Sequence, residues 1–194
     1  MKKFLIILIV LTLFSFSTTD NKFQMKSGNL KQAVNMMGTG IEINTLFDEF
    51  GNKQKIKITS KINTIIKSTE FIANNGKYYQ LDRQKKTYAI STSPEQKGYI
   101  DVTKFSETEK LSYNYKDIGE EIYLQRDCKK VSINSIEKKT SGTYWIYKNI
   151  VLKMDSKIMN FPVKLETKEF IELPLLNKSE FEIPNDFKLV NEIK

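Results

Sequence analysis

Two alternating segments follow one another in residues 150–168, which read IVLKMDSKIMNFPVKLETK. In the first segment Ile150, Leu152 and Met154 occupy every second position, and in the second Val163 and Leu165 alternate with charged residues. A period of two is typical of a β-strand with one apolar and one charged face. The two segments therefore predict neighbouring antiparallel strands that pack on a core with one face and meet water with the other.

The same period continues toward the N-terminus, where Ile56 and Ile58 alternate with lysines. Turn signals such as Gly51-Asn52, Asn75-Gly76 and Ser141-Gly142 separate the apolar runs, and Asn-Gly is the strongest short hairpin signal. About ten strands at this spacing predict a mainly β (α+β) fold built on a curved, antiparallel, half-open barrel. The expected strands cover residues 30–37, 41–47, 53–62, 65–73, 77–81, 87–92, 123–133, 143–147, 150–158 and 163–167.

Two segments depart from this pattern. Residues 101–113 predict a short helix with Asp101 as its N-cap and with Phe105 and Leu111 turned inward as a thin lid. The alternation slips by one residue in 123–133, which predicts a β-bulge near residues 127–130, with Cys128 beside the bend.

The N-terminal segment has the order of a secretory signal peptide. Lys2 and Lys3 precede an apolar run at residues 4–14, and small residues at 15–18 offer a cleavage site. We expect residues 1–17 to be a signal peptide and residues 18–194 to form a single domain. An uncleaved anchor is the alternative, but the run falls short of the about 20 residues that span a bilayer.

The composition limits the partners. The chain has 31 basic and 23 acidic residues, and removal of Lys2 and Lys3 leaves a net charge of +6. A basic surface is attracted to anionic lipid headgroups, so we expect peripheral contact with an anionic membrane surface. Only Arg83 and Arg126 are arginines, whereas base readers favour arginine, so we expect no nucleic-acid partner.

The residue inventory also argues against catalysis. The chain has no histidine and only one cysteine, which excludes Ser-His-Asp and Cys-His catalysis, the usual zinc sites and an internal disulfide. Paired carboxylates remain at Asp48-Glu49, at Glu120-Glu121 and at Glu180 with Glu182, but adjacent side chains in a strand point to opposite faces. We expect a protein that is not an enzyme and needs no cofactor or metal.

Several motifs resemble those of one family. Residues 75–82, NGKYYQLD, with Lys86-Thr87 after them, are similar to the D-G-x-x-x-W-x-Y-D … Q hairpin of periplasmic outer-membrane lipoprotein carriers of the Lol type. Residues 181–187, FEIPNDF, resemble the closing F-x-x-P-x-G-x-D strand of these carriers. Residues 45–51, TLFDEFG, are similar to a turn in secreted members of unknown function that share the carrier fold.

This resemblance implies a half-open barrel with a short helical lid over an apolar cavity that shelters acyl chains. The leading hypothesis is therefore an exported, soluble protein, periplasmic or secreted, that binds a lipid or other apolar ligand. The rival hypothesis is an envelope protein–protein interaction or structural module whose barrel interior is packed core; the oligomeric state stays open. The residues expected to line the ligand site are Ile43, Ile58, Tyr79, Leu81, Leu152, Met154 and Leu165.

The signal peptide gives the first testable prediction. We expect the protein recovered from the cell envelope or medium to begin close after Ser17, because the small residues that follow the apolar run suit signal peptidase. N-terminal sequencing of that protein makes the measurement. An intact Met1 on the envelope protein would contradict the prediction.

Overall fold

The computed structural model describes residues 22–62, 65–74, 77–91, 100–173 and 176–191. The expected signal peptide, the Asn75-Gly76 turn and the loop that follows β6 lie outside these residues. One twelve-stranded sheet dominates the described chain. Its strands are β1 (Gly28–Met36), β2 (Thr39–Asp48), β3 (Lys53–Ile62), β4 (Ile65–Asn74), β5 (Lys77–Asp82), β6 (Thr87–Ser91), β7 (Lys116–Tyr123), β8 (Arg126–Ser135), β9 (Thr140–Tyr147), β10 (Ile150–Ile158), β11 (Phe161–Glu172) and β12 (Lys188–Leu189). Three short helices accompany it, namely η1 (Glu49–Gly51), α2 (Glu107–Ser112) and η2 (Lys178–Phe181).

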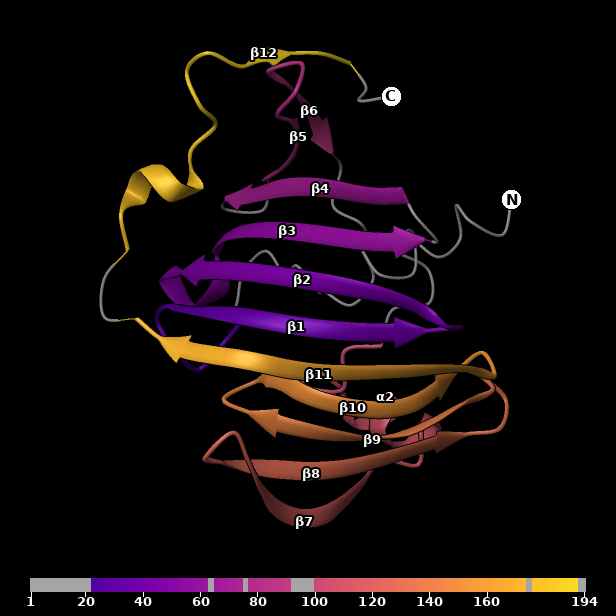
Figure 1. Ribbon diagram of the computed structural model, residues 1–194. Coiled ribbons are helices and arrows are strands. Elements are labelled where there is room, and N and C mark those ends of the chain that lie inside the picture. The colour runs from indigo at the N-terminus through magenta and orange to yellow at the C-terminus, as the bar shows by residue number, and fades with distance from the viewer. Residues whose placement is uncertain (1–21, 63–64, 75–76, 92–99, 174–175, 192–194) are drawn as a thin grey trace.

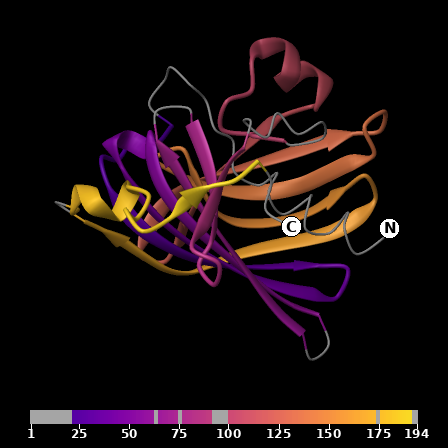
Figure 2. The same ribbon diagram turned by 90° about the horizontal axis from the view of Figure 1, so that it is seen from above.

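The sheet is curved and does not close. Its strand order is β12-β6-β5-β4-β3-β2-β1-β11-β10-β9-β8-β7, so β7 and β12 form its two edges (Figure 1). Every neighbouring pair is antiparallel except β12 and β6, which run parallel. Seen from above, the strands fan out around the bend of the sheet (Figure 2). This architecture confirms the half-open antiparallel barrel expected from the sequence.

The first and eleventh strands join the two halves of the sheet. Their register runs from Gly28 opposite Glu172 to Met36 opposite Val163, with one irregularity between Lys31 and Gln32. All other antiparallel contacts link strands that follow one another along the chain. The sheet is therefore two consecutive meanders connected by one long-range pairing.

Tight turns close four of the hairpins. Both residues of each two-residue turn have positive φ: Met37 and Gly38, Leu124 and Gln125, Lys148 and Asn149, and Met159 and Asn160. Such turns match the right-handed twist of the strands that they connect. One of them divides the expected strand 123–133, because the chain turns back at Leu124 and β8 begins at Arg126.

The irregularity near Cys128 also differs from the expectation. The register between β8 and β9 is regular, and the shift lies in β7 between Asp117 and Glu120, where Gly119 has a φ of 107°. The predicted bulge at residues 127–130 is therefore wrong, since the extra residue belongs to the neighbouring edge strand. Cys128 is a fully buried free thiol, and burial raises its pKa.

The main core lies on one face of the sheet, which we call the inner face. Side chains from both meanders meet there, and Val102 and Tyr113 from the segment that carries α2 pack onto them. The core residues contributed by the sheet are Val34, Met36, Ile41, Ile43, Ile56, Ile58, Val131, Ile133, Tyr144, Ile146, Met154, Val163 and Leu165.

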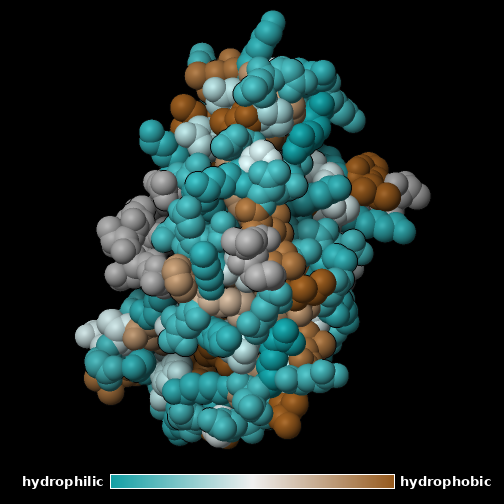
Figure 3. All heavy atoms as spheres, turned by 90° about the vertical axis from the view of Figure 1, so that its left-hand side faces the viewer, coloured by the Kyte–Doolittle hydropathy of each residue, from teal (hydrophilic) through white to brown (hydrophobic). Residues whose placement is uncertain are grey.

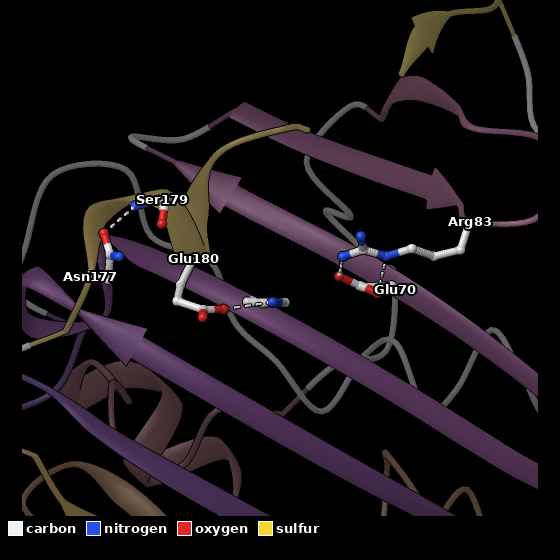
Figure 4. A network of polar contacts seen from close by, with 6 residues as sticks. Glu70, Arg83, Asn177, Ser179 and Glu180 are labelled. Carbon is white, nitrogen blue, oxygen red and sulfur yellow. Dashed lines mark hydrogen bonds and ion pairs between the residues drawn. The ribbon is translucent and has the colours of Figure 1, made fainter. Parts of the chain in front are cut away.

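The C-terminal segment covers part of the opposite, outer face. Helix η2 contacts β3 and β4, Phe181 is buried, and Glu180 forms an ion pair of 2.7 Å with Lys55 of β3 (Figure 4). Beside this pair, the Arg83 guanidinium donates to both carboxylate oxygens of Glu70. Residues 181–187 thus do not form the closing strand that the family resemblance implies, because the chain from η2 onward crosses the outer face and pairs only at β12.

Two glycines in strands give a prediction about packing. A Cβ atom added to Gly142 would lie 2.3 Å from the Cβ of Ser156 and 2.7 Å from its Cα, whereas one added to Gly40 would meet nothing within 4 Å. We expect Gly142→Ala to lower the free energy of unfolding by about 1–3 kcal/mol, because the neighbouring strand must shift. Gly40→Ala is the matched control and should change it by less than about 0.5 kcal/mol. Urea denaturation measures both, and equal midpoints for the two variants would contradict the predicted clash.

Candidate functional site

The inner face brings together residues from both halves of the sheet. Ile43 of β2 lies opposite Ile58 of β3, and Met154 of β10 lies opposite Leu165 of β11. Leu165 in turn lies opposite Val34 of β1, so these pairs belong to one continuous apolar surface. All four of the predicted lining residues named here have relative exposures between 0 and 8%.

The remaining predicted lining residues do not all join them. Leu152 has the same phase as Met154 and is fully buried, but it packs in a second cluster with Leu30, Phe47 and Phe170. That cluster lies nearer the end of the sheet at which β1 begins. It also holds Phe23 and Met25, which precede β1.

Tyr79 and Leu81 lie on the outer face. Tyr79 lies opposite Ile72 of β4, which lies opposite Lys55 of β3. Leu81 lies opposite Glu70, which lies opposite Lys57, and both lysines point away from the core. Cross-strand partners in an antiparallel sheet share a face. The structure therefore brings five of the seven predicted residues to the inner side of the sheet and leaves these two on the other side.

Residues 100–115 form an irregular segment that packs on the main core of the inner face; we call this segment the cover. Its helix α2 begins at Ser106, where the Ser106 hydroxyl accepts from the Glu109 amide and the Glu109 carboxylate accepts from the Ser106 amide. This capping box starts the helix five residues later than predicted. As a result Leu111 is 82% exposed rather than turned inward, and none of the helix residues is buried.

Aromatic side chains on either side of the helix attach the cover to the sheet. The rings of Phe105 and Tyr113 stack with centroids 4.8 Å apart, and Tyr115 meets Phe105 edge-on. The Asn134 amide of β8 donates to the Tyr113 carbonyl at 2.7 Å. The cover is thus held by a few rings and its ends, while its helix lies outside.

Polar groups are buried near the start of the cover. Lys22 donates from Nζ to Gln54 Oε1 at 3.3 Å, and Gln54 Nε2 donates to the Gly51 carbonyl at 2.6 Å. Burial lowers the pKa of Lys22 to about 7; the charge of Asp101 opposes this shift and that of Lys104 adds to it. The Lys104 ammonium is itself buried and has no hydrogen-bond partner in the described part of the chain.

Sequence reasoning missed these polar groups and the Tyr113 anchor. A lysine in the segment before the first strand carries no pattern that distinguishes it from surface lysines. Tyr113 could have been found as the aromatic residue at the end of the expected helix. Its partner on β8, however, depends on tertiary packing.

Four acids of the predicted carboxylate pairs form local contacts in the structure. Asp48 accepts from the Glu49 amide, and Glu49 binds Lys53 at 2.6 Å. Glu121 binds Lys130, and Glu180 binds Lys55, each at 2.7 Å. Within the described ranges no group of three or more acidic or cysteine side chains is placed to hold a metal ion.

Comparison with known proteins supports the fold alone. No family model matches the sequence, and no curated protein matches it. An uncharacterized conserved protein from Thermus thermophilus has a similar structure, with 9% identity, a TM-score of 0.54, and coverage of 86% of this chain and 91% of that one. A chain in the MucA/MucB complex of Pseudomonas aeruginosa has 10% identity, a TM-score of 0.54, and coverage of 88% and 61%.

The chain thus spans about three fifths of the matched chain of that complex. A looser match, with a TM-score of 0.41, 8% identity and coverage of 92% and 96%, is a LolA superfamily protein from Nitrosomonas europaea. The half-open antiparallel barrel expected from the sequence is confirmed as a fold by the two matches with TM-scores of 0.54. In the described parts of the chain, no helix is both long and apolar enough to cross a membrane.

The buried lysine predicts a specific pH dependence of stability. The pKa of Lys22 is about 7 in the folded protein and near 10.5 when the chain is unfolded, so between these values the unfolded chain binds more protons. The free energy of unfolding should therefore rise with pH from 7 toward 10, relative to a Lys22→Met variant that lacks this group. Below pH 7 the difference between the two proteins should become constant.

Urea midpoints of both proteins between pH 6 and 9.5, at roughly half-unit steps, provide the measurement. Lys22→Met should also be the more stable protein at pH 7, since a buried ammonium loses its hydration. Parallel profiles for the two proteins would show that Lys22 is not buried in solution.

Proposed function

We propose that this protein is an exported, non-enzymatic carrier that binds a lipid or another apolar ligand on the inner face, beneath the cover. The observation that carries this proposal is the way in which the face is covered. Within the described residues, a broad apolar surface from both meanders lies under the cover, whose helix buries no residue. A packed domain usually covers such a surface with an amphipathic helix or a second sheet.

The energetics favour an acyl chain as the ligand. Moving one methylene from water to an apolar site gains about 0.8 kcal/mol, so a chain of ordinary length offsets a large ordering cost. Displacing the cover exposes chiefly Val102, Phe105 and Tyr113, because the α2 side chains already meet solvent. An acyl chain that replaced these three side chains on the inner face would leave the sheet itself intact.

The charge of the chain supports a role near membranes. The net charge is +8 over the full sequence, and a basic protein is drawn to anionic headgroups. We propose that the protein works outside the cytoplasm, in the periplasm or beyond it, where it contacts such a surface.

An envelope interaction module with a filled interior is the second candidate. The near-complete burial of Ile43, Met154 and Leu165 favours it, because a packed core also excludes water from these side chains. The similar chain in the MucA/MucB complex belongs to a protein assembly, which fits this candidate at the level of the fold.

Uptake of a fluorescent long-chain fatty-acid analogue separates the two candidates. A carrier should bind it saturably, and Met154→Glu should weaken uptake at least about tenfold, because the charge would sit on the inner face. Lys153→Glu is the control at the adjacent position, which faces Trp145 on the other side, and it should leave uptake within about twofold.

A buried charge also threatens the fold, so a second variant keeps the test sharp. Ile58→Phe adds volume to the inner face without adding charge, and it should reduce uptake while the protein remains folded by circular dichroism. Absence of saturable uptake by the unaltered protein, together with no lipid retained in native mass spectrometry, would leave the interaction module as the better reading.

A further inference from the structure

Four hairpins end side by side at one edge of the sheet. The turns after β1, β8 and β10 and the adjoining ends of β3 and β4 lie on the right in Figure 1 and spread along an arc in Figure 2. The strand register fixes their order, because Gly40 lies opposite Lys61 and Met36 lies opposite Val163. The Asn160 amide donates to the Lys139 carbonyl at 2.9 Å and so joins two of the turns directly. We call this edge the hairpin rim.

The hairpin rim exposes large apolar side chains. Six of the thirteen exposed large apolar residues of the described chain belong to these hairpins, although turns normally carry small and polar residues. A seventh, Leu111 of α2, lies close by, because Ser112 accepts from the Lys138 ammonium at 3.5 Å. The six are Met37, Ile65, Ile66, Ile136, Met159 and Phe161.

Lysines without acidic partners accompany these residues. Lys61 lies near the end of β3 and Lys67 near the start of β4, while Lys139 precedes β9 and Lys157 lies near the end of β10. All four are exposed, and none forms an ion pair within the described residues. Glu137 is the one acidic residue in the described parts of these turns, and Glu42 and Asp155 are the exposed acids nearest to them in the strands, so basic residues outnumber acidic ones at the rim.

The opposite end of the sheet differs in its exposed side chains. It faces the viewer in Figure 3, where hydrophilic side chains cover most of the surface and apolar ones form smaller patches. Two of its basic residues pair with acids, Lys53 with Glu49 at 2.6 Å and Lys148 with Glu172 at 3.4 Å, whereas Lys26 and Lys77 form no ion pair within the described residues. The rim differs in its number of exposed large apolar residues, six against Phe50, Ile122 and Ile171 at this end.

We propose that the hairpin rim is a docking surface for an anionic phospholipid bilayer. Isolated apolar side chains at the tips of hairpins can enter the boundary between headgroups and acyl chains, while lysines beside them meet anionic headgroups. The apolar residues of the rim are distributed over four hairpins, three of which also carry exposed lysines, which suits a fluid, negatively charged partner.

This inference deepens the proposed function and rests on it. Docking would bring to the lipid surface the end of the sheet that lies beside α2. Docking itself needs no bound ligand. The two ideas can therefore fail separately: uptake of the fatty-acid analogue tests the inner face, and vesicle binding tests the rim.

Co-sedimentation of the purified protein with vesicles provides the test. We expect binding to phosphatidylcholine vesicles that contain phosphatidylglycerol, little binding to phosphatidylcholine alone, and loss of binding as salt is raised. The double variant Lys139→Glu/Lys157→Glu should bind at least about tenfold more weakly, since each basic residue near an anionic surface raises partitioning about fivefold. Lys57→Glu/Lys77→Glu is the control with the same change in net charge, because both lysines are exposed away from the rim.

A second pair of variants tests the apolar contacts. Ile136→Ser/Met159→Ser should weaken vesicle binding severalfold, whereas Ile122→Ser/Leu189→Ser should not; the exposures of these residues are 89, 62, 72 and 55% in that order. Neither pair should alter uptake of the fatty-acid analogue in the absence of vesicles.

Three results would overturn the docking surface. These are equal binding to neutral and anionic vesicles, equal losses from the rim and control variants, and a rim variant that converts a dimer to a monomer on size-exclusion chromatography without a change in vesicle binding. The last result would assign the rim to a second copy of the chain.

Discussion

Pairing between β1 and β11 holds the molecule together. The paired residues lie between 127 and 144 positions apart in sequence, whereas the other antiparallel contacts are local hairpins. Without this pairing the chain would form two separate curved sheets, each with an open edge and with half of the inner face. Closing so long a loop is entropically costly and slows folding. The apolar contacts between the two meanders must therefore offset that cost.

The two faces of the joined sheet are covered by different parts of the chain. The connection between the meanders covers the inner face with a few aromatic rings, and the C-terminal segment covers part of the outer face through Phe181 and the Glu180–Lys55 ion pair. An exposed ion pair contributes little to stability, so the buried phenylalanine is the more important contact of the C-terminal segment. The inner cover has no comparable helix face, and this difference is why we place the binding function there.

Much of this fold could be predicted from residue alternation, because the period of two survives in β2, β3, β10 and β11. Alternation could not relate the phase of one strand to that of another, so Tyr79 and Leu81 were expected on the face that Ile43 and Ile58 occupy. It also missed the turn at Leu124-Gln125, since neither residue is a usual turn former. The buried position of Lys22 follows from tertiary packing, which no local pattern records.

The cover continues directly into the edge strand β7. The hydrogen bond from Asn134 to Tyr113 extends the ladder between β7 and β8, and the residues of β7 from Lys116 to Ile122 are exposed. Edge strands with exposed hydrogen bonds open locally at a small fraction of the free energy of global unfolding. Fraying of β7 would therefore release the end of the cover without disturbing the pairing of β1 with β11, so access to the inner face would be coupled to the opening of an edge strand.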